Sequence, residues 1–300
     1  MKGIADQIAI VTGGASGIGR ALCEELARRQ AVVVVADLNS DEASRVAQAL
    51  TDAGGRAAAV PVDVADSDSV QELVRTTLAR HGRIDLMFNN AGIGWAGDFQ
   101  EMPLADLDRV VRINLSGVLY GASAVYPIMV KQGAGHIVNT ASFFSGLIPV
   151  PGITVYSATK HAIVGFSLSL REEARMFGVN VSVVCPSFIR SNIDANSSMI
   201  LRGQTDSAAP SLPGSTPEAT RLARAILKGI SRKKSIVIMP TFIRLFWWLY
   251  RLSPSLSAAL HYPVFMRSRR RRQPSRVAAT FLSPARWLFR LLLRRRPAKK

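Results

Sequence analysis

The chain of 300 residues, 48% hydrophobic and 20% charged, is long and apolar enough to bury the core of one large α/β domain. Its two cysteines, Cys23 and Cys185, lie far apart in apolar stretches, which excludes a disulfide-stapled fold and indicates a reducing compartment. No cysteines or histidines have the spacing of metal ligands, so we expect no metal site.

The net charge of +17 comes from one end of the chain. Residues 1–230 contain all 21 acidic residues and 20 of the 38 Lys and Arg, whereas residues 231–300 contain 18 basic residues and no acid. Only this tail therefore needs an explanation based on charge. Because no apolar signal segment opens the chain and no run reaches about 18 uninterrupted apolar residues, we expect a cytoplasmic protein, with peripheral attachment to the cytoplasmic membrane face as an option for the tail.

A glycine-rich turn follows the first apolar run. Residues 7–11 are typical of a buried parallel strand, and a helical pattern extends over residues 20–30. The turn between them reads Thr12-Gly13-Gly14-Ala15-Ser16-Gly17-Ile18-Gly19. Glycines let the backbone approach a pyrophosphate, and the start of a helix offers free N–H groups. The turn therefore indicates a dinucleotide site, with a ligand-free glycine turn as the alternative.

The next expected strand, 31–36, ends at Asp37, eighteen residues beyond Gly19. A carboxylate roughly 20 residues downstream of such a turn holds a ribose 2′-hydroxyl and repels a 2′-phosphate. The positions where a basic residue would offset that repulsion contain Ser16 and Leu38. This favours NAD(H) over NADP(H), although Asp37 is open to a second interpretation as a strand-end cap.

Helical and strand patterns then alternate along the chain. They predict helices over 41–53 and 67–80 and strands over 57–62 and 84–88; Asp63-Val64 and Asn89-Asn90-Ala91-Gly92 follow these strands. Small polar and glycine residues after a strand suit a ligand-lining turn at the carboxyl edge of a sheet. The alternation predicts a Rossmann-type doubly wound parallel sheet of about seven strands, with helices on both faces.

A Tyr-x-x-x-Lys pair, Tyr156 and Lys160, opens a later helical run. The i and i+4 spacing places both side chains on one helix face. A tyrosine pKa near 10 is too high for acid–base work at neutral pH, and a nearby ammonium group lowers it. Alone, this spacing is common, and a surface pair on an ordinary helix is the alternative.

Together these motifs resemble the short-chain dehydrogenase/reductase family, in its group with the Thr-Gly-x-x-x-Gly-x-Gly turn, over roughly residues 5–230. The resemblance implies an NAD(P)-dependent oxidoreductase acting on an alcohol or ketone. It implies cofactor contacts at Thr12, Gly13, Ser16, Gly17, Ile18, Gly19, Asp37, Asp63, Val64, Asn90, Ala91, Gly92, Tyr156, Lys160, Pro186, Ile189 and Ser191.

The resemblance also implies four catalytic residues. Asn114 lies in an expected helix over 107–129, and Ser142 closes an expected strand over 136–141. Ser142 would hold the substrate oxygen, and Tyr156 would transfer the proton. Lys160 would lower the pKa of Tyr156 and hold the nicotinamide ribose, and Asn114 would fix a water linking Lys160 to solvent. The hydride chemistry belongs to the cofactor.

One segment departs from the family pattern. After an expected strand over 179–184, the family has Pro-Gly and then Thr, but this chain has Pro186-Ser187 and, further on, Ser191. We expect the Ser191 hydroxyl to replace that of the threonine. The backbone at Ser187 must then avoid any conformation that only glycine tolerates.

Apolar residues in the loops after the strands that carry the predicted catalytic residues predict a hydrophobic substrate, such as a lipid-, steroid- or isoprenoid-like alcohol or ketone. These are Trp95, Phe143, Phe144, Leu147, Phe188, Ile189 and residues 199–201. The alternative for some of these residues is a place in the core. The resemblance implies a homodimer or homotetramer. The alternative for the whole chain is a catalytically silent protein of the same fold that binds through its tail.

An expected helix over 216–229 and strand over 235–239 complete the domain 1–240, and residues 241–300 form an extension. Residues 242–252 are rich in aromatic side chains, and Arg286, Arg290 and Arg294 recur within an apolar run. This pattern favours peripheral attachment to an anionic membrane over nucleic-acid binding. In a third interpretation, residues 242–266 cover the active-site mouth or a subunit interface, and the last thirty residues are disordered.

Overall fold

The computed structural model describes residues 3–187, 200–201 and 219–255. The chain divides into two units, Met1–Arg244 and Leu245–Lys300, and each is described by itself. The predicted cofactor residues Ile189 and Ser191, the predicted substrate residue Phe188, and the last arginines of the tail lie outside the described residues.

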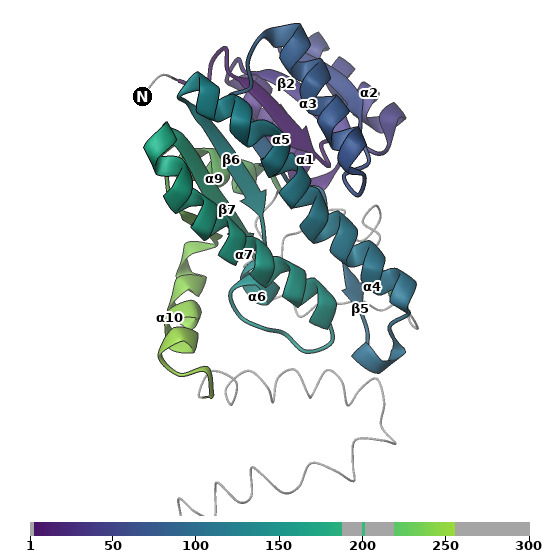
Figure 1. Ribbon diagram of the computed structural model, residues 1–300, viewed down its shortest axis with the longest axis vertical. Coiled ribbons are helices and arrows are strands. Elements are labelled where there is room, and N and C mark those ends of the chain that lie inside the picture. Colours follow the sequence, from purple (N-terminus) through teal and green to yellow (C-terminus); the bar gives the residue numbers. More distant parts are fainter. Residues whose placement is uncertain (1–2, 188–199, 202–218, 256–300) are drawn as a thin grey trace, which may run out of the picture. The chain divides into compact units, whose positions relative to one another are not determined.

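Within the described part of the first unit, seven parallel strands form one sheet in the order β3-β2-β1-β4-β6-β7-β9 (Figure 1). The doubly wound sheet predicted from the sequence is therefore confirmed. Chain order reverses between β1 and β4, which is where ligands bind in open α/β sheets. The strands are β1 Ile8–Thr12, β2 Val32–Asp37, β3 Arg56–Pro61, β4 Leu86–Asn89, β6 Gly135–Thr140, β7 Val179–Pro186 and β9 Ile236–Met239.

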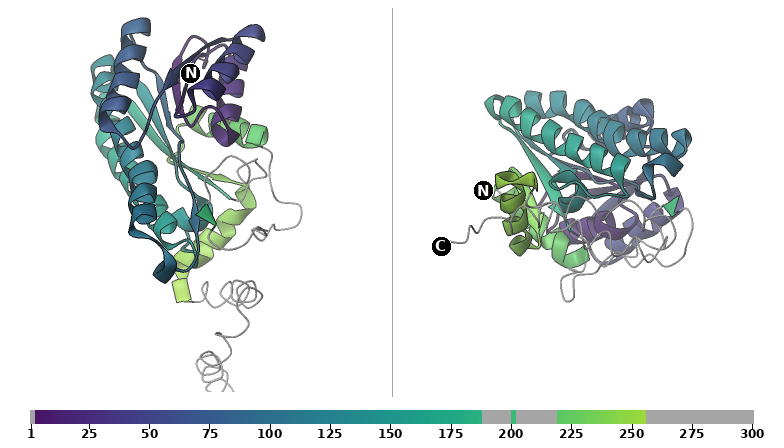
Figure 2. Two further views of the ribbon diagram at one scale, coloured as in Figure 1. Left: turned by 90° about the vertical axis from the view of Figure 1, so that its right-hand side faces the viewer. Right: turned by 90° about the horizontal axis from the view of Figure 1, so that it is seen from below.

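Helices cover both faces of this sheet (Figure 2). Side chains alternate across the strands, so that Val11 packs into one core and Ile10 into the other. One core contains α1, α2 and α9, with Leu26, Leu50 and Ile226 fully or nearly fully buried. The other contains α3, α5 and α7. The helix bounds are α1 Gly17–Arg28, α2 Ser40–Asp52, α3 Ser67–His81, α5 Gly117–Gln132, α7 Thr154–Ala174 and α9 Ala219–Ser231.

The helix expected over 107–129 is longer than predicted and is interrupted. It consists of α4 Leu104–Val111, a π-helical turn η2 Arg112–Ser116, and α5. In the described part of the chain, Leu104–Gln132 is the one helix whose length and composition would suit a membrane span. Its buried stripe faces the domain core, which identifies it as a core helix; the stripe contains Val110, Asn114, Val118, Ala122, Val125 and Met129.

Shorter elements connect these layers. The structure adds a two-stranded parallel sheet that the sequence did not predict, between β5 Trp95–Ala96 and β8 Ile200–Leu201. The remaining elements are η1 Phe99–Glu101, α6 Phe143–Gly146, η3 Arg175–Phe177, η4 Thr241–Ile243 and α10 Arg244–Leu252.

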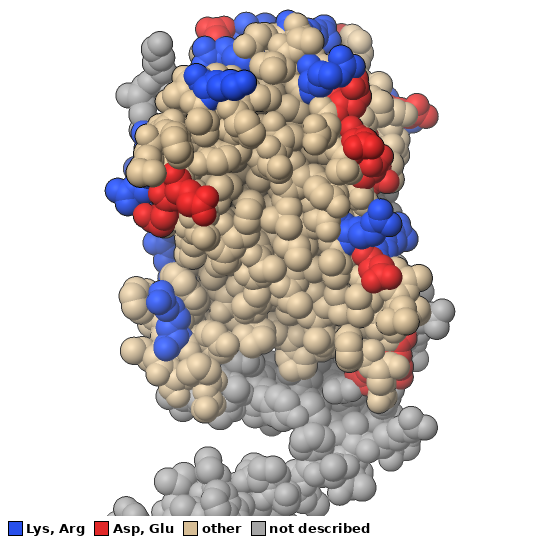
Figure 3. Space-filling model, in the orientation of Figure 1, with Lys and Arg blue, Asp and Glu red and all other residues tan. Residues whose placement is uncertain are grey.

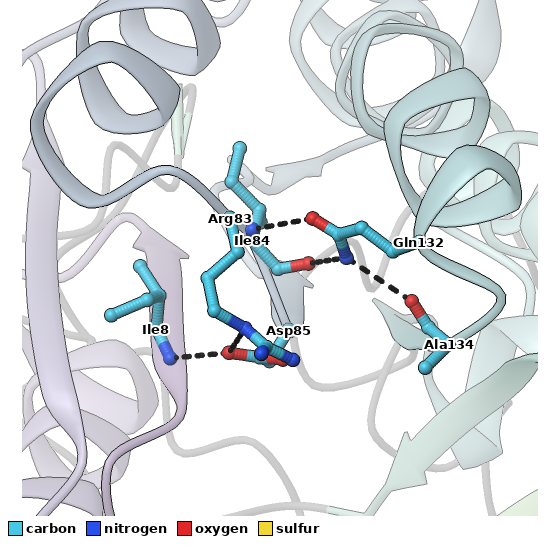
Figure 4. A network of polar contacts seen from close by, with 6 residues as sticks. All are labelled: Ile8, Arg83, Ile84, Asp85, Gln132 and Ala134. Carbon is cyan, nitrogen blue, oxygen red and sulfur yellow. Dashed lines mark hydrogen bonds and ion pairs between the residues drawn. The ribbon is translucent and has the colours of Figure 1, made fainter.

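A polar network fixes the amino edge of the sheet (Figure 4). The buried Asp85 carboxylate accepts a hydrogen bond from Ile8 N at 2.9 Å and pairs with Arg83. The Gln132 side chain bonds both backbone groups of Ile84, at 3.0 and 2.8 Å. These bonds tie the starts of β1 and β4 to the end of α5. They leave the opposite, carboxyl edge for ligand binding.

Charged side chains lie around the margin of the face covered by α5 and α7, and the centre of that face is uncharged (Figure 3). Its outward positions include the small residues Ala158, Ala162 and Gly165. We still expect a homo-oligomer, and an uncharged helical face of this kind suits contact with a second copy.

Candidate functional site

Thr12 joins the glycine turn to the neighbouring strand at the carboxyl edge. Its hydroxyl donates to Phe88 O at 3.2 Å and accepts hydrogen bonds from Asn90 N at 3.0 Å and Ala91 N at 3.1 Å. The Asn90 amide donates to Thr12 O at 3.1 Å. The turn after β1 and the segment after β4 therefore form one rigid unit at the point where the strand order reverses.

The glycines of this turn make room for a ligand next to the backbone. Gly13 has a φ of +65°, which disfavours other residues. A Cβ on Gly19 would lie 1.9 Å from Gly13 O, so only glycine allows α1 to start so close to the turn. Ser16, at the N-cap of α1, makes no side-chain capping bond. The residues present thus fit a pyrophosphate, which would bind the first-turn N–H groups of α1.

Asp37 ends β2 beside this turn. Its carboxylate accepts a hydrogen bond from Ala15 N and another from Asn39 N, each at 3.0 Å. It therefore serves as a strand-end cap, the second of the two interpretations of this residue. Each oxygen keeps a lone pair, so the cap leaves the carboxylate able to accept from a ribose hydroxyl as well. Leu38, beside it, is 73% exposed and uncharged.

The residues predicted to lie on the adenine side of the cofactor, Asp63 and Val64, follow β3. The Asp63 carboxylate accepts from Ala65 N at 2.9 Å, and Asp63 N donates to Ser69 Oγ at 3.0 Å. Val64 is buried, and its backbone oxygen would lie 2.9 Å from a Cβ on Gly117. The loop thus packs closely against Gly117 of α5, while Asp63 is exposed.

Tyr156 and Lys160 lie together in the first turns of α7. The Lys160 Nζ is 5.5 Å from the centre of the Tyr156 ring and donates to Thr140 O, at the end of β6, at 2.9 Å. Lys160 is 3% exposed. This burial lowers the pKa of Lys160 to about 8, which leaves most of the ammonium charged at neutral pH.

The pKa of Tyr156 shifts in the opposite direction to the one predicted from the sequence. Burial raises it to about 12, and a hydrogen bond with Ser142 offsets only part of this rise. The prediction that Lys160 lowers it is therefore wrong for the protein alone. The reason is geometric: the Lys160 amine lies over the ring and bonds to Thr140 O, while the phenolate would be buried.

Ser142 precedes α6 and lies next to the phenol. Its hydroxyl donates to Phe144 O at 2.5 Å, within an irregular turn. In this turn Ser145 has a φ of +105° and is completely buried. Because Ser142 has a single proton, it must leave Phe144 O before it can donate to a substrate oxygen.

Asn114 occupies the π-helical turn and is fully buried. Its side chain forms a pair of hydrogen bonds with the backbone of Ile93, both at 2.8 Å. A Cβ on Gly92 would lie 3.1 Å from Asn114 Oδ1 and 3.5 Å from Lys160 Nζ. Gly92, Asn114 and Lys160 therefore converge, and π turns occur frequently at functional sites. The water expected at Asn114 remains a prediction.

At the end of β7, the departure from the family pattern has little structural cost. Pro186 is buried, and Ser187 N donates to Met239 O at 2.9 Å. Ser187 is not among the residues with positive φ, so a side chain is tolerated here.

Among the predicted substrate residues whose side chains the structure describes, three belong to the core. Trp95, Phe143 and Leu147 are buried, and Trp95 packs with Val110. Phe144 is partly exposed. Sequence reasoning missed the two backbone groups that hold the predicted catalytic residues Lys160 and Asn114. These are Thr140 O and the Ile93 peptide, and backbone groups carry no residue signature.

The family model for short chain dehydrogenase matches residues 7–199. A 3-oxoacyl-(acyl-carrier-protein) reductase of Synechocystis is 38% identical over 198 residues, which are 65% of this chain and 79% of that protein. Oxidoreductase UcpA of Salmonella typhimurium is 37% identical over 190 residues, 63% of this chain and 72% of that protein.

Solved structures show the same fold. A short chain dehydrogenase/reductase from Burkholderia phymatum in complex with NAD has a TM-score of 0.76 and 30% identity, covering 85% of this chain and 96% of that one. A metagenomic short-chain oxidoreductase in complex with NADP has a TM-score of 0.66 and 27% identity, covering 79% and 98%.

Proposed function

Because this chain belongs to the short-chain dehydrogenase family of NAD(P)-dependent oxidoreductases, we propose that it interconverts a hydrophobic secondary alcohol and its ketone, with NAD(H) preferred. The observation that supports this is that Ser142 and Lys160 both lie beside Tyr156, and that Lys160 also approaches Gly92, in the segment next to the glycine turn. A bound nicotinamide supplies the hydride chemistry, and the protein supplies placement and proton transfer.

Tyr156 is the proton donor and acceptor of this proposal. With a pKa of about 12, the phenol is protonated at neutral pH and can donate to a carbonyl oxygen during reduction. In oxidation Tyr156 must lose its proton before it can accept one from the alcohol, so its raised pKa disfavours oxidation at neutral pH. Ser142 orients the substrate oxygen once its hydroxyl turns away from Phe144 O.

Lys160 and Asn114 have positioning roles around the same point. Lys160 is held by Thr140 O close to Gly92, where it would bind the nicotinamide ribose hydroxyls. Asn114 holds the Ile93 peptide and thereby fixes the segment that follows Gly92. Both contacts keep the site rigid, so that little ordering is needed when substrate binds.

The cofactor preference rests on Asp37. Its carboxylate lies at the glycine turn, and neither Ser16 nor the exposed Leu38 offers a cation to a 2′-phosphate. One related structure holds NAD and another NADP, so the preference is carried by this residue alone. We expect a higher kcat/KM with NADH than with NADPH.

A hydrophobic substrate is supported by the surroundings of Ser142. Phe144 is partly exposed beside it and packs edge-on against Phe143, with ring centres 4.9 Å apart. No charged side chain hydrogen-bonds to Ser142 or Tyr156 in the described residues. A screen of lipophilic ketones and secondary alcohols, followed by NADH absorbance, identifies the class; turnover only of charged substrates would contradict it.

Tyr156→Phe tests the mechanism. We expect kcat to fall by about 10²–10⁴-fold, because the proton donor is lost, while NADH affinity measured by fluorescence stays within about twofold. Tyr126→Phe, on α5 and outside the site, is the matched control and should retain turnover. Comparable turnover in Tyr156→Phe would refute the role of Tyr156. Wild-type protein that binds NADH but turns over no substrate would support the silent binding protein instead.

A further inference from the structure

The helix α10 carries an exposed apolar stripe. Leu245, Trp248 and Leu252 are spaced i, i+3 and i+7, which places them on one side of the helix. They are 75%, 57% and 81% exposed. Of the ten large hydrophobic residues exposed in the described part of the chain, five lie within residues 242–252. Apolar side chains concentrated in this way mark an interaction surface.

The rest of the helix is suited to a boundary between apolar and polar phases. Trp247 and Trp248 are in contact, with ring centres 6.2 Å apart. The Arg251 guanidinium lies over the Trp247 ring at 5.2 Å, where it remains free to face polar groups. Tryptophan and tyrosine, here Tyr250, combine an apolar body with a polar group and are enriched at membrane interfaces.

The charge of this region helps to distinguish between the partners that such a surface could bind. Residues 231–300 contain 18 basic residues and no acidic residue, so this part of the chain is attracted to any polyanion. A nucleic acid would neutralise the charge but would leave the leucine and tryptophan stripe in water. An anionic bilayer suits both the positive charge and the apolar stripe, because its phosphates lie directly above hydrocarbon.

We propose that α10 binds in the headgroup region of an anionic lipid bilayer, with Leu245, Trp248 and Leu252 directed toward the acyl chains. The helix has 9 residues. A membrane-spanning helix needs roughly 20 residues, so α10 lies along the interface. The basic residues of 231–300 add long-range attraction that salt screens. The surface thus holds the enzyme reversibly at a membrane.

Sedimentation of the full chain with phosphatidylcholine vesicles, with and without phosphatidylglycerol, tests this proposal. We expect binding to the anionic vesicles, weakening as salt rises. The variant L245S/W248S/L252S should bind about tenfold or more weakly, because the apolar contact is lost. The matched control is L104S/M176S, which removes two residues that are 78% and 83% exposed outside α10. It should bind as the wild type does.

Three results would overturn the proposal. Failure of the wild-type protein to bind anionic vesicles would overturn it directly. Equal binding of the stripe variant would show that charge alone attaches the chain. Displacement of the protein from vesicles by duplex DNA, with DNA affinity unchanged in the stripe variant, would assign the tail to nucleic acid. Circular dichroism of each variant shows that it is folded, and this control, which needs no turnover, keeps the test separate from that of the proposed function.

Discussion

The two edges of the sheet use polar groups in opposite ways. At the amino edge, Asp85 bonds to Ile8 N and to Arg83, and Gln132 bonds to the backbone of Ile84. At the carboxyl edge, Lys160 and Asp37 are held by a few backbone bonds but keep capacity for further partners. Buried polar groups thus stabilise one edge, while at the other they are oriented for a ligand. Changes at the amino edge should cost stability, and changes at the carboxyl edge should cost binding.

The largest expected effect concerns stability at the amino edge. Asp85→Ala removes the partner of Arg83 and leaves the buried Ile8 N–H without its acceptor. We expect the free energy of unfolding, measured by urea denaturation, to fall by about 3 kcal/mol. Glu72→Ala, which breaks an exposed ion pair with Arg75, is the control and should leave it unchanged. Equal decreases in the free energy of unfolding of the two variants would contradict the idea that the polar groups of the amino edge stabilise the fold.

Gly19→Ala tests the carboxyl edge. The new Cβ would lie 1.9 Å from Gly13 O, so the turn must move away from its ligand-binding shape. We expect NADH affinity, measured by fluorescence titration, to fall by about a hundredfold, or about 2.7 kcal/mol. Gly3→Ala, at a glycine without a positive φ where a Cβ would meet only Ala5 N at 3.9 Å, is the control for cofactor binding. Normal NADH affinity in Gly19→Ala would show that the turn is not the pyrophosphate site.

His136, at the start of β6, makes the amino edge sensitive to acid. Burial lowers its pKa from 6.5 to about 3, helped by Arg171 and Lys233, and its Nε2 is 2.8 Å from Ser182 Oγ. A depressed pKa gives stability that is present above the unfolded pKa and is lost as the pH falls below it. At about pH 5 this loss is about 2 kcal/mol.

His136→Gln keeps a side-chain amide near Ser182 but cannot titrate. The decrease in unfolding free energy between neutral and mildly acidic pH should therefore be smaller in this variant than in the wild type, as measured by urea denaturation. An identical pH dependence of the two proteins would mean that His136 is already accessible to protons in the folded state.

The smallest expected effect concerns cofactor choice at the carboxyl edge. Asp37→Asn keeps an acceptor oxygen for the turn but removes the charge that repels a 2′-phosphate. We expect the ratio of kcat/KM for NADH to that for NADPH to fall by about tenfold, or about 1.4 kcal/mol. Leu38→Arg, which adds a cation beside it, should shift the ratio in the same direction. A wild-type preference for NADPH would overturn the role of Asp37.

The sequence by itself determined the features that depend on near neighbours in the chain. The glycine turn, Asp37 after β2 and the alternation of helices with strands follow from local periodicity, and the predicted fold and family agree with the structure and its relatives. The Tyr156–Lys160 spacing likewise predicted two side chains on one face of α7.

Only the tertiary structure decided how these side chains are held and charged. Lys160 bonds to a carbonyl twenty residues away, and Asn114 bonds to a peptide twenty-one residues away, from a π turn that no pattern announced. The pKa of Tyr156 rises because the surrounding chain buries it. Burial and long-range backbone partners are properties of packing, so they cannot be derived from the residue types along a segment.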